Sequence, residues 1–138
     1  MEQNSKIQAI KEFIEMCPLL KNGKIIPNYL KEENYSYAIV QRKEDIILTK
    51  YKDGGSIRQI PFNFVVQFPI SNRSIENLAN SKFGEDFINW IEEQDSIGNL
   101  PKITNVQHIE CTQRDSLIAR TNTQSVFEIP MRCTYYQA

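Results

Sequence analysis

The sequence predicts an α+β fold, in which two helices cover a mostly antiparallel or mixed sheet in the order α-β-β-β-α-β-β. Residues 5–17 and 74–94 carry apolar side chains at the spacing of an amphipathic helix. Residues 60–70 and 126–136 alternate apolar and polar side chains with the period of a half-buried strand. A chain of 138 residues has the size of one ordinary domain, so we expect a single domain over residues 1–138.

The first helix is expected at residues 5–17. Its apolar face consists of Ile7, Ile10, Phe13, Ile14 and Cys17. Ser5 can cap the first turn, and Pro18 ends the helical pattern. The following residues, 19–33, include an Asn-Gly pair and a proline, which predict a connection with little regular structure.

A hairpin is expected next. Residues 35–41 and 46–51 are rich in β-branched and aromatic side chains, and the polar residues 42–45 separate them. Residues 52–56, Lys-Asp-Gly-Gly-Ser, form the strongest turn signal in the chain, because the glycines can supply positive φ angles.

The clearest strand follows this turn. Its apolar face consists of Ile60, Phe62, Phe64, Val66, Phe68 and Ile70. Pro61 has no N–H to donate, so this part of the strand is expected at a sheet edge or a bulge.

The second helix is expected at residues 74–94, where Ser81 or Gly84 could interrupt it. Its core face consists of Phe83, Phe87, Trp90 and Ile91. Two strands are expected after it, at residues 103–112 and 126–136, with a polar loop before the second.

Composition indicates a soluble globular protein. Hydrophobic residues make up 41% and charged residues 24% of the chain, and the net charge of −1 favours neither nucleic acid nor a membrane surface. No run approaches the ~20 apolar residues of a spanning helix, and the N-terminus does not resemble a signal peptide. The three cysteines are too few and too widely spaced to predict a disulfide framework or a metal site.

Residues that could carry catalysis are sparse, so we expect a non-enzymatic protein without a cofactor. The single histidine, His108, has no recognisable nucleophile or carboxylate partner in the sequence. The Gly-Gly turn joins two strands and lacks the lysine spacing of a phosphate-binding loop. Glu92 and Glu93 are adjacent on a helix and diverge by about 100°, so they do not form a carboxylate pair.

Three strings of the sequence resemble a known family when taken in order. Residues 50–59, 80–94 and 132–137 read KYKDGGSIRQ, NSKFGEDFINWIEEQ and RCTYYQ. Their order and spacing resemble the small minor capsid or tail proteins of phages and prophages of Gram-positive bacteria, which are similar to tail terminators. The resemblance covers most of the chain, from the first helix to the last strand.

The resemblance implies a structural role without catalytic residues. Tail terminators form a ring, commonly a hexamer, on the finished tail tube, where they stop its growth and present a surface to the head. The implied partners are further copies of the chain, the tail-tube protein and a head-completion protein, without a membrane or specific nucleic acid. The implied location is the host bacterial cytoplasm during assembly and the head–tail junction of the virion.

Charge is uneven along the chain and supplies candidate interface residues. Residues 34–73 contain six basic and three acidic residues, whereas residues 74–98 contain one basic and six acidic residues. One candidate patch is the basic hairpin region, with Lys50, Lys52, Asp53, Gly54, Gly55, Ser56 and Arg58, beside Arg42 and Lys43. The other is the acidic outer face of the second helix, with Glu85, Glu92 and Glu93. The two patches either meet between neighbouring subunits or are simply solvated.

Two other functions remain open from the sequence. The chain could be a different head–tail connector or neck adaptor, or a non-catalytic cytoplasmic adaptor. A neighbouring gene for a major tail-tube protein would favour the tail terminator.

Overall fold

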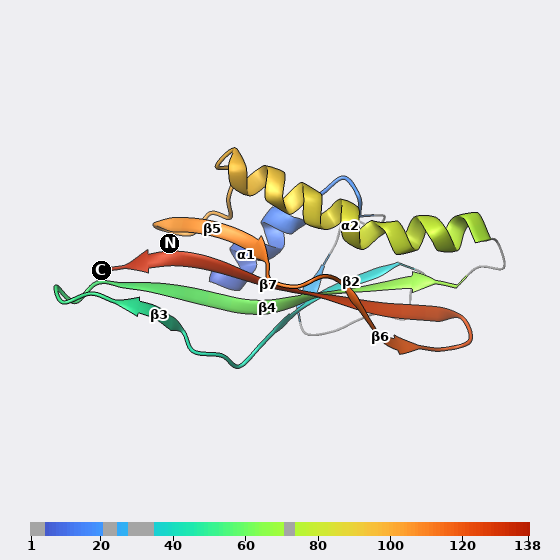
Figure 1. Cartoon of the computed structure of the whole chain (residues 1–138), viewed down its shortest axis with the longest axis horizontal. Coiled ribbons are helices and arrows are strands. Elements are labelled where there is room, and N and C mark those ends of the chain that lie inside the picture. The colour runs from blue at the N-terminus through green and yellow to red at the C-terminus, as the bar shows by residue number, and fades with distance from the viewer. Residues whose placement is uncertain (1–4, 21–24, 28–34, 71–73) are drawn as a thin grey trace.

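The α+β fold predicted from the sequence is confirmed. The computed structural model describes residues 5–20, 25–27, 35–70 and 74–138. In these ranges, two helices lie over one face of a seven-stranded sheet (Figure 1). The elements are α1 (Lys6–Ile14), β1 (Ile26–Pro27), β2 (Ser36–Gln41), β3 (Ile47–Lys50), β4 (Ser56–Pro69), α2 (Ser74–Ser96), β5 (Val106–Cys111), β6 (Ser116–Arg120) and β7 (Gln124–Gln137).

Two long strands form the spine of the sheet. β4 and β7 each contain 14 residues and pair antiparallel throughout, from Ser56 opposite Gln137 to Pro69 opposite Gln124. β2 and β3 add antiparallel to β4, and β5 and β6 add antiparallel to β7, while the short β1 pairs in parallel with β2. β3 and β6 therefore lie on opposite edges and at opposite ends of the spine (Figure 1).

The prediction that residues 35–41 and 46–51 form a hairpin is wrong. β2 and β3 do not pair with each other; both pair with β4, so they are two parts of one interrupted edge. The other edge has the same construction, because β5 and β6 both pair with β7. The sequence predicted two strands after the second helix, and β6 is the third, which the prediction missed.

A proline in the neighbouring long strand accounts for each interruption. The Pro61 carbonyl accepts a hydrogen bond from the Arg42 N–H at 3.0 Å, and the Pro130 carbonyl accepts one from the Thr112 N–H at 2.8 Å. The N–H and C=O of a residue in an antiparallel strand point to the same neighbour, so each proline offers its edge strand no donor. The edge strand breaks at that point, but β4 itself pairs with β7 through Pro61 without a register shift, so the predicted bulge is not found there.

The core lies between the sheet and the helices. Alternate residues of β4 point at α2, and the Phe64 and Phe87 rings stack with centroids 4.7 Å apart. α1 buries Ala9, Ile10, Phe13 and Ile14. The ring centroids of Phe13 and of Trp90 in α2 lie 5.4 Å apart, so the two helices also pack on each other.

The helix boundaries differ slightly from the predicted ones. Ser5 caps α1 as expected, because its hydroxyl accepts from the Gln8 N–H at 3.1 Å, but the helix ends at Ile14. α2 continues unbroken through Gly84, where a Cβ would lie 2.3 Å from the Asp115 carboxyl carbon. Gly84 thus permits the close approach of Asp115. Of the predicted connection at 19–33, residues 21–24 and 28–33 lie outside the described residues.

Candidate subunit interface

The Gly-Gly turn closes the hairpin between β3 and β4. Its base is formed by Tyr51, whose N–H donates to the Gly55 carbonyl oxygen at 2.8 Å. Gly54 has a φ of +99°, which L side chains rarely adopt, and the Asp53 carboxylate accepts from the Gly55 N–H at 3.0 Å. The two glycines therefore serve the turn, as the sequence predicted.

The candidate basic patch is narrower than the sequence suggested. Its exposed members are Lys50, Lys52, Asp53 and Gly54. Gly55 and Ser56 are buried within the chain, and a Cβ on Gly55 would lie 2.1 Å from the Tyr136 hydroxyl oxygen. Arg58 is half-buried, and its Nε donates to the Ser56 hydroxyl at 3.0 Å. The exposed cations of the patch are thus Lys50 and Lys52, together with Lys43 beside it.

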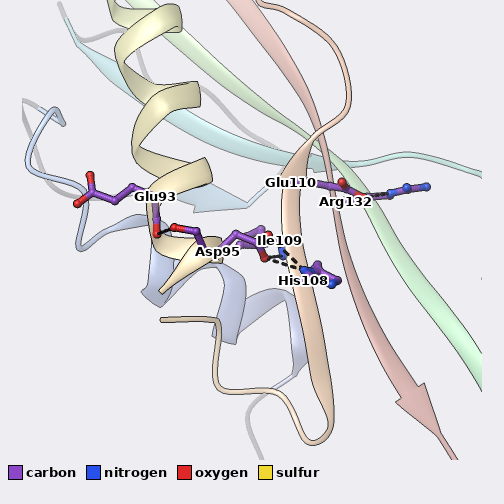
Figure 2. Close-up of polar contacts among 7 residues, drawn as sticks. Glu93, Asp95, His108, Ile109, Glu110 and Arg132 are labelled. Atoms are coloured by element: carbon purple, nitrogen blue, oxygen red, sulfur yellow. Dashed lines mark hydrogen bonds and ion pairs between the residues drawn. The ribbon is translucent and has the colours of Figure 1, made fainter. Parts of the chain in front are cut away.

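The candidate acidic patch divides between two sides of α2. Glu85 and Glu92 are two turns apart and line a cleft of about 360 Å³ against residues 111–115, which Arg114 also lines. Glu93 is rotated by about 100° from Glu92 and points away from β5 (Figure 2). The three glutamates therefore do not form one surface.

Asp95 fixes the end of α2 to the sheet, a role that the sequence did not reveal. Its Oδ1 accepts from the Ile109 N–H at 3.1 Å and lies 3.1 Å from Nδ1 of His108, both on β5 (Figure 2). The His108 side chain is 63% exposed. The histidine therefore has a carboxylate partner, Asp95, which the sequence analysis did not recognise. The contact lies at the surface.

Two exposed strand edges are the features that sequence reasoning missed. All four residues of β3 and all five residues of β6 are exposed. Large apolar side chains stand on both edges: Ile46, Ile47, Leu48 and Tyr51 on the first, and Leu117 and Ile118 on the second. Among the described strands, β3 pairs only with β4 and β6 only with β7, so the outer backbone of each edge faces no strand.

The helix-free face of the sheet carries a polar groove of about 420 Å³. Its charged side chains have partners within the chain. Arg42 forms an ion pair with Glu44 and donates to the Asn63 side chain at 2.8 Å, and Arg132 forms an ion pair with Glu110. The Asn63 amide also donates to Glu128 at 3.1 Å. This groove therefore presents a balanced network rather than an isolated charge.

The cysteines are poor nucleophiles at neutral pH. Burial raises the pKa of Cys17 to about 11. Burial, with a smaller contribution from nearby carboxylates, raises the pKa of Cys111 and of Cys133 to about 12. The described residues contain no group of three or more His, Cys, Asp or Glu side chains that could hold a metal ion.

Comparisons with known proteins add no family to this description. No known protein family matches the chain, and no curated protein sequence matches it either. Among the helices of the described ranges, neither has the length and apolar character needed to cross a membrane.

Proposed function

We propose that this chain is a structural protein of a tailed phage or prophage that caps the tail tube as a hexameric ring and joins the tail to the head. The observation that carries the proposal is the pair of exposed strand edges, β3 and β6, on opposite sides of the sheet. A ring needs two different patches on each subunit, which meet head to tail around a closing rotation. The two edges supply such a pair.

The strings that resemble tail terminators support the proposal by their position. Residues 50–59 form the end of β3, the turn and the start of β4, and residues 132–137 form the end of β7. These two strings lie side by side, because Ser56 pairs with Gln137 and Arg58 with Tyr135. Two of the three resembling strings thus lie together at the end of the spine that carries the exposed turn, and the third, residues 80–94, lies in α2.

The proposal is tested by assembling tails without this chain. A tube that lacks its cap should continue to grow, so we expect abnormally long tubes in electron micrographs of assemblies from which the gene is deleted. Supplying the chain should restore a uniform length. Tubes of normal length that join heads without the chain would contradict the proposal. Tubes of normal length that fail to join heads would favour a neck adaptor.

A further inference from the structure

The two exposed edges have the same arrangement of charge and hydrophobicity. Residues 45–50 read DIILTK and residues 115–120 read DSLIAR, so each begins with an aspartate and ends with a base. The four residues between are uncharged, and most are apolar. When the two edges align antiparallel, the aspartate of each strand therefore lies opposite the basic residue of the other strand.

We propose that β3 of one copy pairs antiparallel with β6 of the next copy, so that the sheets of neighbouring subunits become continuous. This contact names the ring interface of the proposed function and rests on it. The pairs in the proposed register are Asp45 with Arg120, Ile46 with Ala119, Ile47 with Ile118, Leu48 with Leu117, Thr49 with Ser116 and Lys50 with Asp115. Pairs directly opposite in an antiparallel ladder contribute most of its side-chain stabilisation.

The register is specific because a shift by one residue loses the matches. Shifted one way, Arg120 lies beside Ile46; shifted the other way, Leu48 lies beside Ser116. Asp45 and Arg120 are both exposed, so their pair can form at the edge. Asp115 is half-buried against Gly84, so the Lys50 pair contributes less.

The backbone of the two edges is also alike. The pairing of β3 with β4 shifts register between Ile47 and Thr49, and the pairing of β6 with β7 shifts between Leu117 and Ala119. A bulge increases the local right-handed twist, which disfavours pairing with a flat strand. In the proposed register the two bulges lie one residue apart, so the two edges are twisted alike at nearly the same place and can follow each other.

The proposed register keeps the helices of neighbouring copies on one side. Thr49 pairs with Ile57, and Ser116 pairs with Glu128, and both partners alternate onto the helix-free face of the spine. Residues directly opposite each other in a ladder point to the same face, so Thr49 and Ser116 match. Successive subunits would then join their sheets through β3 and β6 with the helices of all copies on the same side.

Pairing of like edges is the main competitor. Two β3 edges, or two β6 edges, can also align aspartate with base, which would give a closed dimer with twofold symmetry. A ring requires unlike edges to meet, and this requirement selects β3 against β6. An experiment that separates unlike from like pairing therefore tests the proposal.

Disulfide cross-linking makes this separation in the full-length protein. Leu48→Cys and Leu117→Cys are prepared as two single variants, one of them carrying a mass tag; both positions are exposed, at 42% and 52%. Directly opposite residues have Cα atoms about 4.5–5.5 Å apart, within the range a disulfide spans. The native cysteines retain raised pKa values, so they react slowly under mild oxidation.

The mixture should form a disulfide-linked heterodimer, while each variant alone should form no more dimer than the wild type. The double variant should form a ladder of multimers that collapses on reduction. The control mixes Leu48→Cys with Gln113→Cys, an exposed residue that lies outside β6 and four residues before Leu117, and this mixture should not cross-link.

Dimers from either single variant alone, or equal yields from the mixture and its out-of-register control, would overturn the edge contact. The same holds if the mixture forms no heterodimer. These outcomes are distinct from failure of the proposed function. If the double variant forms a ladder but the chain does not affect tube length, the edge contact stands and the tail-capping role is contradicted. If the chain controls tube length but no ladder forms, the tail-capping role stands and the edge contact is contradicted.

Discussion

At the scale of single residues, the aromatic cluster shows which core contacts matter most. Phe87 is fully buried, stacks on Phe64 and Phe83, and also contacts Trp90. Trp90 is only half-buried and lies at the margin of this cluster, against Phe13. Helical spacing placed both residues on one face but could not rank them, because their depth depends on how α1 crosses α2.

Phe87→Ala should lower the free energy of unfolding by about 3–5 kcal/mol, because it removes a fully buried ring from a packed core. Trp90→Ala should cost less, since part of its ring is already in contact with water. Urea denaturation of the two variants and the wild type measures both values. A larger loss for Trp90→Ala would contradict this account of the core.

Cys133 is one of three cysteines whose raised pKa should make the fold sensitive to alkaline pH. Burial, and then the charge of Asp95, raises its pKa from 9.0 to about 12. A thiol with a raised folded pKa stabilises the fold below the unfolded pKa, and this stability is lost as pH rises toward the folded pKa. The loss amounts to about 1.4 kcal/mol for each pH unit above the unfolded value.

Cys133→Ala should reduce the alkaline loss of stability. Between about pH 8 and about pH 10, the wild type should lose roughly 1.4 kcal/mol more than the variant, because the variant has no thiol to ionise at this position. Any cavity that the alanine leaves lowers stability at both pH values and cancels in the comparison. Equal losses in the two proteins would show that this thiol does not titrate differently on folding.

At the scale of elements, the sequence predicted what local patterns determine. The two helices and the strand at residues 60–70 follow from apolar periodicity, and the turn at 52–56 follows from its glycines. The pairing partners of the edge strands could not be predicted from local sequence. Pro61 and Pro130 interrupt edge strands that lie beside them in the sheet but are distant from them in sequence. β6 was missed because its five residues are exposed on both faces and do not alternate.

Asp95 should stabilise the junction of α2 and β5. Asp95→Ala leaves the Ile109 N–H without its carboxylate acceptor, so we expect a loss of about 1–3 kcal/mol in chemical denaturation. Asp95→Asn retains a side-chain oxygen and should lose less. His108→Ala should leave stability nearly unchanged, because this side chain is largely exposed. A His108→Ala loss equal to that of Asp95→Ala would show that the histidine carries the junction.

At the scale of the whole molecule, the sequence predicted charged interface residues but not the surface that the fold exposes. Glu85 and Glu92 line a cleft against residues 111–115, whereas Glu93 points away from β5 (Figure 2), and two residues of the basic turn are buried. Apolar residues 46–48 and 117–118 resemble core strands in the sequence, and only the sheet order shows that they stand at its edges. Local pattern cannot report which strand ends a sheet.

Charge reversal should distinguish the edge contact from the charged patches. Arg120→Asp should weaken self-association by facing Asp45 with a like charge, and adding Asp45→Arg to the same chain should restore it. Self-association should also weaken when the salt concentration is raised above 0.1 M, because the Debye length then falls below about 10 Å. Sedimentation velocity measures each effect, with the exposed Lys102→Asp as the control for net charge.

If the basic and acidic patches form the interface instead, a different pair of charge reversals should restore assembly. If they meet between subunits, Lys52→Glu with Arg58→Glu should block tail completion, and Glu85→Lys with Glu92→Lys in the same chain should partly restore it. Rescue by this set, together with no effect of Asp45 and Arg120, would assign the interface to the patches instead of the edges.

The location of this chain on a finished tail is the most direct test of the proposed function. Tails purified from the phage or prophage that encodes it can be imaged by electron microscopy after labelling with an antibody to the chain. The predicted result is label confined to the head-proximal end of the tube, with a ring of density at that end that is absent from tails made without the gene. Label distributed along the tube, or its absence from purified tails, would contradict the tail-capping role.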